Sequence, residues 1–167
     1  MPCRDRATAV IETAGEGVMA MNDLSEVRQR REALLRAIAS IEAALAAPAS
    51  DVRWPEGLGS ALSGLRTTFE QHVVETEAPD GILAQVRERA PRLSNQIDQL
   101  VGEHVSITAG IEHLIDRLDH APTERAAEET ANIREQALRL LTAIVRHRHL
   151  GADLLYEAYN VDVGGPG

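Results

Sequence analysis

The 167-residue chain contains no lysine and few aromatic side chains: one Phe, one Trp and two Tyr. Its core must therefore be built from Leu, Ile, Val and Ala, a composition that suits helices better than sheets. No apolar run approaches the roughly 18 residues of a membrane-spanning helix, and acidic residues interrupt the N-terminal segment where a signal peptide needs an apolar stretch. The sequence thus predicts a cytoplasmic protein with no membrane segment.

Cysteine, excess positive charge and the common catalytic motifs are scarce as well. Cys3 is the only cysteine, so no disulfide can form within the chain, and without a motif around it we expect an inert thiol. The net charge is −9 and the 17 arginines are dispersed, which disfavours a nucleic-acid partner because the phosphate backbone would be repelled. No serine-nucleophile motif, H-E-x-x-H or phosphate-binding loop occurs, so the sequence points to no particular class of enzyme.

Apolar residues recur at steps of three and four in four long stretches, which is the spacing of amphipathic helices. The predicted helices cover residues 24–47, 55–78, 91–118 and 123–159, with a short helical piece at 82–88 before the third. Prolines at the breaks and short loops favour an all-α fold, an antiparallel up-down-up-down four-helix bundle. We expect this single domain at residues 22–160, a flexible arm at 1–21 and an irregular tail at 161–167.

Six histidines occur, and a helical wheel at about 100° per residue divides those on the predicted helices into two groups. His104 falls at the centre of the apolar stripe of the third helix, and His72 and His147 fall at the flanks of the stripes of the second and fourth. His113 and His149 fall on the opposite, solvent side. Because neighbouring helices of the bundle run in opposite directions, the three inward histidines are expected in one layer.

A layer of histidines inside a helical bundle has two interpretations. Neutral imidazoles from several helices can converge on zinc or iron, with carboxylates completing the site. The residues of such a site would be His72, His104, His147, Glu77 and Glu103. Either glutamate would then be a supplementary ligand or a hydrogen-bond partner of a histidine. Alternatively, the layer is a hydrogen-bonded polar core without metal, in which Arg31 and Arg148 on the stripes of the first and fourth helices pair with carboxylates.

Three segments carry a family resemblance: FEQHVVETEAPDG, LVGEHVSI and RHRHLGADLLYEAY. Together with the helix order and the histidine layer, they resemble the hemerythrin-like (HHE cation-binding) family over residues 24–161. The resemblance implies a four-helix bundle around a non-haem di-iron centre, whose ligands are a first-helix His, an H-x-x-x-E pair, an H-x-x-x-H pair and a fourth-helix His followed by a carboxylate. It also implies oxygen binding, sensing of oxygen, nitric oxide or peroxide, or iron handling.

This chain keeps the first ligand of each family pair and departs from the family at the others. The histidines of the predicted layer stand at the first positions. The residues in place of the other ligands are Thr76, Thr108, Gly151 and Arg31. Because Arg31 would bring a positive charge into the cavity, these departures favour a mononuclear three-histidine site with an open position, or a site that has lost its metal.

A small-ligand site is a further interpretation of the same residues. Room inside the bundle would come from Thr76, Thr108 and Gly151, which replace larger ligands. Arg31 and Arg148 would hold a small anionic ligand there. Such a ligand would bind without any metal.

A metal-free bundle that acts through its surface also stays open as a function. It would form a homodimer through a helix face or bind another partner. Tyr156 and Tyr159 are amphipathic anchors for such a partner, or they cap the end of the bundle.

Overall fold

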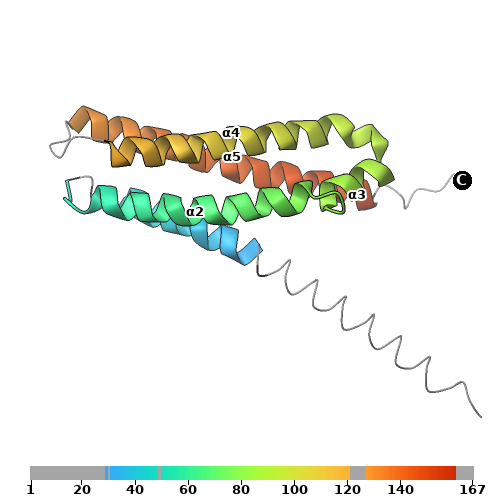
Figure 1. The fold of residues 1–167 in the computed structure, drawn as a ribbon, viewed down its shortest axis with the longest axis horizontal. Coiled ribbons are helices and arrows are strands. Elements are labelled where there is room, and N and C mark those ends of the chain that lie inside the picture. The colour runs from blue at the N-terminus through green and yellow to red at the C-terminus, as the bar shows by residue number, and fades with distance from the viewer. Residues whose placement is uncertain (1–28, 30, 49, 121–126, 161–167) are drawn as a thin grey trace, which may run out of the picture.

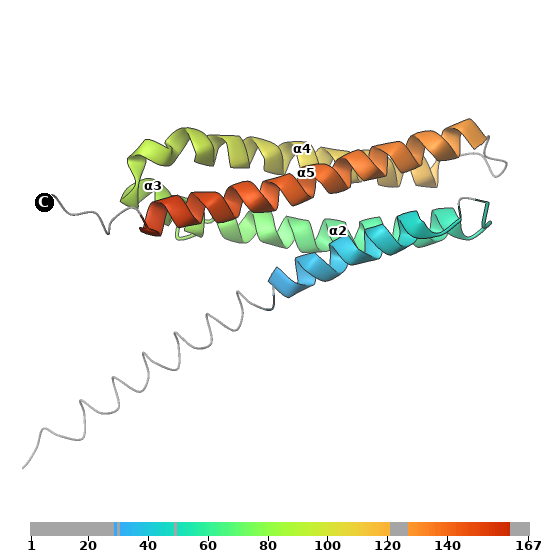
Figure 2. The ribbon, with the colours of Figure 1, turned by 180° about the vertical axis from the view of Figure 1, so that it is seen from behind.

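The structure is a computed structural model that describes residues 29, 31–48, 50–120 and 127–160. Within this part of the chain, helices are the only regular secondary structure and no strand occurs, which confirms the all-α prediction. The long helices lie lengthwise beside one another (Figure 1, Figure 2). None of the described helices is apolar over a stretch long enough to cross a membrane.

The helices begin and end close to the predicted residues. Their bounds are 31–46 for the first helix, Trp54–Glu77 for α2, Ile82–Arg89 for α3, Ser94–Asp119 for α4 and Ala127–Asn160 for α5, with a 3-10 turn, η1, at Pro91–Leu93. Pro55 in the first turn of α2 and Pro91 in η1 occupy positions where a missing N–H costs no helical hydrogen bond. Cys3, the arm at 1–21, the tail at 161–167 and the predicted starts of the first and last helices lie outside the described residues.

The main core joins the first helix, α2, the second half of α4 and the first half of α5. In this core α4 packs against both α2 and α5, and the first helix lies beside α2 (Figure 2). Its most deeply buried side chains include Leu58, Leu62, Leu65, Ile111 and Ile133. They are branched aliphatic residues on the predicted stripes, as expected for a chain so poor in aromatics.

A second, smaller core lies where α2 has ended and α3 takes its place beside α4 and α5 (Figure 1). Its buried members come from α3, η1, the start of α4 and the end of α5: Leu83, Val86, Ala90, Leu93, Ile97, Leu100, Leu154 and Ala158. On α4, His104 lies between Leu100 of this core and Ile107 of the main core. His147 holds the corresponding place on α5, so histidines mark the junction between the two cores.

The turn between α2 and α3 depends on Gly81. Its N–H donates to the carbonyl of Ala78 at 2.8 Å, and its own carbonyl accepts from the N–H of Gln85 in α3. A Cβ at Gly81 would lie 2.6 Å from the carbonyl oxygen of Glu75 and 2.7 Å from that of Thr76. Because these are backbone atoms, a side chain at this position would displace the end of α2.

Replacing Gly81 with alanine is expected to lower the free energy of unfolding by about 1–3 kcal/mol, the usual range for overpacking a buried position. Gly64 on α2 is a matched control, because a Cβ there would meet nothing within 4 Å. Gly64→Ala is expected to be neutral or to stabilise by up to about 1 kcal/mol, since alanine favours a helix. Urea unfolding measures both values, and equal stabilities of the two variants would contradict the close approach at Gly81.

Candidate metal centre

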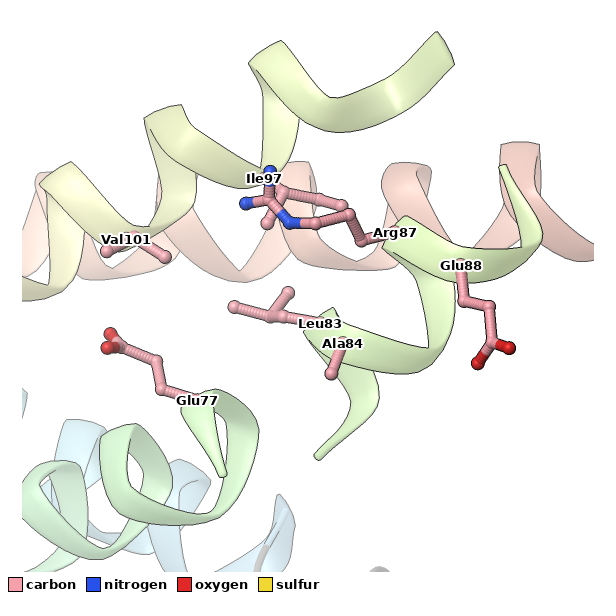
Figure 3. Close-up of a pocket in the computed structure, with 7 residues that line it drawn as sticks. All are labelled: Glu77, Leu83, Ala84, Arg87, Glu88, Ile97 and Val101. Atoms are coloured by element: carbon pink, nitrogen blue, oxygen red, sulfur yellow. The ribbon is translucent and has the colours of Figure 1, made fainter. Parts of the chain in front are cut away.

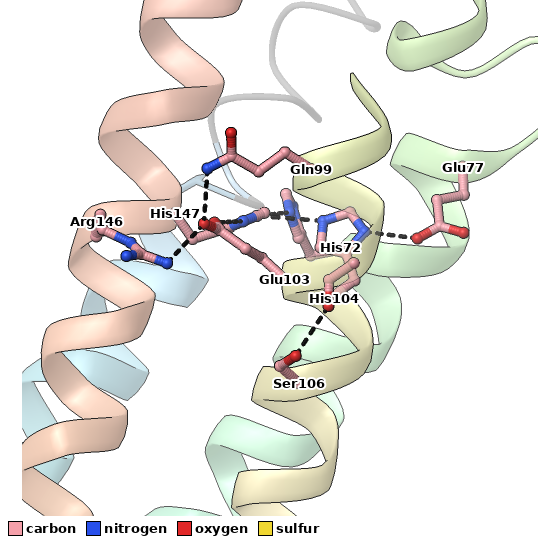
Figure 4. A network of polar contacts seen from close by, with 9 residues as sticks. His72, Glu77, Gln99, Glu103, His104, Ser106, Arg146 and His147 are labelled. Carbon is pink, nitrogen blue, oxygen red and sulfur yellow. Dashed lines mark hydrogen bonds and ion pairs between the residues drawn. The ribbon is translucent and has the colours of Figure 1, made fainter. Parts of the chain in front are cut away.

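Three histidine side chains converge between the two cores: His72 of α2, His104 of α4 and His147 of α5 (Figure 4). His104 and His147 are 2% and 4% exposed, and His72 is half-buried. The Nε2 atom of His147 lies 3.1 Å from Nε2 of His104 and 3.3 Å from Nε2 of His72. The predicted layer of three inward histidines is thus confirmed, and so are the exposed positions of His113 and His149.

Two of these imidazoles contact a glutamate carboxylate through Nδ1, the ring nitrogen that faces away from the cluster. His104 Nδ1 lies 2.6 Å from Oε1 of Glu77, the last residue of α2, and His147 Nδ1 lies 3.2 Å from Oε2 of Glu103. The other oxygen of Glu103 accepts a hydrogen bond from Arg146 at 2.8 Å (Figure 4). Both predicted glutamates therefore contact the outer nitrogen of a histidine, on the side away from the converging Nε2 atoms.

The positions of the ring protons follow from these contacts. An ionised carboxylate only accepts hydrogen bonds, so the Nδ1 atoms of His104 and His147 carry the protons. In a neutral imidazole the other nitrogen is then a bare acceptor. The two Nε2 lone pairs face each other at 3.1 Å. This arrangement is repulsive unless a positive charge, either a proton or a metal ion, lies between them.

Burial disfavours a proton on His72 and on His147. Burial, followed by repulsion from His104 and His147, lowers the pKa of His72 from 6.5 to about 4. Burial and repulsion from His104 also lower the pKa of His147, although Glu103 acts in the opposite direction. At neutral pH His72 and His147 are therefore neutral, which is the form of histidine that binds a metal ion.

The spacing of the Nε2 atoms fits a single metal ion. Two nitrogens bound to zinc at about 2.0–2.1 Å, with a tetrahedral angle between them, lie about 3.3–3.4 Å apart. The two separations in this protein, 3.1 and 3.3 Å, are close to that distance. All three ligand atoms lie within 4.8 Å of one another, so small movements of the rings would complete a site with three nitrogen ligands.

Phe69 closes the site on the side of the main core. Its ring centroid lies 5.6, 5.9 and 6.0 Å from those of His72, His104 and His147, and its side chain is 1% exposed. On α5, one turn after His147 and toward the second core, a Cβ at Gly151 would meet nothing within 4 Å, although Gly151 continues the buried stripe of this helix. Phe69 therefore covers the cluster on the side of the main core, and the position of Gly151 is open.

Of the two arginines predicted for the histidine layer, Arg31 does not lie in it. Arg31 is exposed, so the prediction that it faces the interior is wrong; among the described residues the buried stripe of the first helix starts at Leu34. The carboxylates nearest the histidines are already bonded to them, and a buried guanidinium without a carboxylate would be costly. Arg148 is half-buried. Within the described residues neither arginine donates a hydrogen bond to the three histidines, so the predicted polar core is not formed in that way.

Of the threonines at the altered family positions, Thr76 bonds to its own helix. Thr76 and Thr108 are both half-buried. The hydroxyl of Thr76 donates to the carbonyl of His72 at 2.8 Å, within its own helix. This hydroxyl is therefore occupied by the backbone one turn before it.

Arg146 and Gln99 belong to the site and were missed by the sequence analysis. Both side chains donate to Glu103, at 2.8 Å from Arg146 and 3.4 Å from Gln99 (Figure 4). A signal for Arg146 was present, because Glu103 precedes His104 on α4 just as Arg146 precedes His147 on α5. Opposite charges thus accompany two inward histidines on helices that pack together.

The lowered pKa of His72 predicts that the metal-free protein loses stability in mild acid. Between pH 6.5 and about 4 the unfolded chain binds a proton at this histidine and the folded protein does not, so the free energy of unfolding falls as the pH falls through this window. The loss from His72 reaches at most about 3 kcal/mol. Urea unfolding with a chelator, at several pH values, measures it. His72→Gln should flatten the pH dependence, and His113→Gln should leave it unchanged. Equal slopes in all three proteins would contradict a neutral, half-buried His72.

The cluster offers a metal ion three imidazole nitrogens from three different helices. Imidazole suits zinc, iron, copper and nickel, and three protein ligands leave a coordination position for a further ligand. Comparison of the chain with protein-family models, with curated proteins and with solved structures found no match.

Proposed function

We propose that this protein binds one divalent metal ion, zinc or iron, through the Nε2 atoms of His72, His104 and His147. The observation that carries the proposal is the 3.1 Å contact between the Nε2 atoms of His104 and His147, whose Nδ1 atoms both contact carboxylates. In metal sites of this kind the outer carboxylate fixes the ring tautomer and raises the basicity of the ligand nitrogen. Glu77 and Glu103 would hold His104 and His147 in this way.

The proposed fold is an antiparallel up-down-up-down bundle of the hemerythrin-like kind. In support, the end of α2 and the start of α4 lie at the same end of the molecule, joined by α3, and the end of α4 and the start of α5 lie together at the other end (Figure 1). The resemblance to that family also puts its first ligands at the three histidines that converge. Both arguments concern the same three helices, α2, α4 and α5.

The proposed site holds one ion, where the family to which the chain is similar holds two. Thr76 and Thr108 stand where the resemblance expects second ligands, and the hydroxyl of Thr76 is bonded to its own backbone. Glu77 and Glu103 are turned to the Nδ1 atoms of histidines. Three imidazole nitrogens are therefore the ligands within the described residues.

An ion with three protein ligands keeps a coordination position at which a small molecule from solution can bind. The open space at Gly151, one turn after His147 on α5, supports room for such a ligand. The role proposed is therefore binding or sensing of a small ligand, or iron handling. The resemblance to hemerythrin-like proteins makes oxygen, nitric oxide and peroxide the first ligands to examine.

Elemental analysis of the purified, untagged chain tests the metal site. After loading with iron or zinc and removal of excess metal, one ion per chain is expected, and His147→Ala should retain little or none. His149→Ala is the matched control, because His149 lies on the same helix and is exposed. Folded wild-type protein without retained metal, or unchanged retention in His147→Ala, would overturn the proposal.

A metal-free interaction module is the second candidate function, as a homodimer or with another protein. It is supported by Leu155, Tyr156 and Tyr159 near the end of α5, which are 37%, 68% and 43% exposed. The guanidinium of Arg89 lies 4.9 Å from the ring centre of Tyr159. Analytical ultracentrifugation of Tyr156→Ser tests this candidate: a dimer in the wild type that is lost in the variant would favour it, and a monomer in both would exclude a homodimer through this surface.

A further inference from the structure

A hollow lies between the end of α2, α3 and the start of α4, beside the histidine layer (Figure 3). Its volume is about 440 Å³, within the range of pockets that hold small molecules. Its apolar lining consists of Leu83, Ala84, Ile97 and Val101. Glu77 lies at its edge, so one carboxylate borders both the hollow and the buried ring of His104.

The charged groups around the hollow favour a cation. Arg87 also lines it, but its guanidinium donates to Asp98 at 2.7 Å, which offsets its charge. The carboxylate of Glu88 points away from the hollow (Figure 3). Glu77 uses Oε1 for the bond to His104, and a carboxylate has further acceptor sites. Its side chain is 34% exposed, so a ligand in the hollow can reach it.

From this geometry we infer that the hollow binds a small organic cation with a short apolar tail, such as an aliphatic primary amine, and that the bound cation weakens the metal centre. The ammonium group pairs with Glu77, and the tail covers Leu83, Ile97 and Val101. A carboxylate ligand would meet Glu77 and an arginine that is already paired, and an alcohol would lack a charge-assisted bond. The weakening of metal binding rests on the proposed function, whereas the binding of the cation does not.

Glu77 couples the hollow to the histidines. By accepting the Nδ1 proton of His104, its negative charge raises the basicity of the nitrogen that faces the metal site. A cation bound to the same carboxylate withdraws part of that charge and also adds a positive charge near the metal ion. Both effects lower metal affinity. By linkage, the metal weakens binding of the amine by the same factor.

Isothermal titration calorimetry of the full chain with n-hexylamine, hexanoate and hexan-1-ol, in the presence of a chelator, tests the cation site. Hexylamine is expected to bind at least about tenfold more tightly than the other two probes. Glu77→Gln should remove this preference, and Glu88→Gln, the matched control at the same hollow, should retain it. Ala84→Phe fills the hollow and keeps Glu77, and it should weaken binding of hexylamine.

Titration with zinc, with and without saturating hexylamine, tests the coupling. The zinc dissociation constant is expected to rise about fivefold or more, and the rise should vanish in Glu77→Gln. Equal binding of the three probes, or a preference that survives Glu77→Gln, would overturn the cation site. An unchanged zinc dissociation constant would overturn the coupling alone, and absence of zinc binding would overturn the coupling together with the proposed function. The comparison of the three probes in the presence of a chelator does not depend on zinc binding. Failure of the cation site and failure of the proposed function are therefore distinguishable.

Discussion

Saturating zinc is expected to raise the melting temperature of this protein by about 8–16 °C. A ligand that binds only the folded chain stabilises it by about 4 kcal/mol at a free concentration of a thousand times the dissociation constant, and each kcal/mol shifts the melting temperature of a chain of this size by about 2–4 °C. The three histidines come from α2, α4 and α5, so they are brought together only by folding. Thermal unfolding followed by circular dichroism, with zinc and with a chelator, measures the shift.

His104→Ala is expected to abolish this shift, because it removes the ligand that stands between Glu77 and His147. His113→Ala is the matched control: His113 lies on the same helix, is exposed, and should leave the shift intact. Glu77, which loses its partner in this variant, is partly exposed and stays hydrated. The variant should therefore lose its response to zinc without unfolding. A zinc-induced shift of equal size in His104→Ala and in the wild type would place zinc outside the histidine cluster and contradict the proposed centre.

The histidine layer could be predicted from the sequence because each member lies on an apolar stripe of its own helix. On α4 the buried residues Leu100, His104, Ile107 and Ile111 follow steps of four and three without a break. The same reasoning failed for Arg31, which lies one turn before Leu34 on the predicted stripe of the first helix and is exposed. Periodicity identifies a face of a helix, whereas burial also needs a neighbour that covers the face and, for an arginine, a carboxylate that is not already bonded elsewhere.

Contacts between side chains of different helices could not be fixed from the sequence, although the charges beside His104 and His147 hinted at one of them. The bond from Arg146 to Glu103 depends on how far α4 and α5 are rotated and shifted against each other, which the pattern of either helix alone does not determine. The sequence left open whether Glu77 and Glu103 face a metal or a histidine. Side-chain rotamers decide this, and in the structure each carboxylate meets an Nδ1 atom.

Phe69→Ala is expected to lower the free energy of unfolding of the metal-free protein by about 3–5 kcal/mol, the usual range for truncating a buried aromatic side chain. Phe69 is the only phenylalanine in the chain, is 1% exposed and contacts the rings of all three histidines. The cavity would open at the junction of the two cores. Val74→Ala on the same helix is the control, because its side chain is 71% exposed and its effect should stay within about 0.5 kcal/mol. Urea unfolding in chelator measures both.

Phe69→Ala also tests whether Phe69 keeps the histidine rings in place for metal binding. Phe69 donates no bond to a metal, but its ring limits how far the imidazoles can turn away from one another. Zinc affinity should therefore fall in Phe69→Ala although every ligand is kept, and it should be unchanged in Val74→Ala. A loss of stability with unchanged zinc affinity would mean that Glu77 and Glu103 alone position the rings. A loss of stability no larger than that of Val74→Ala would contradict the packing of the three histidines on Phe69.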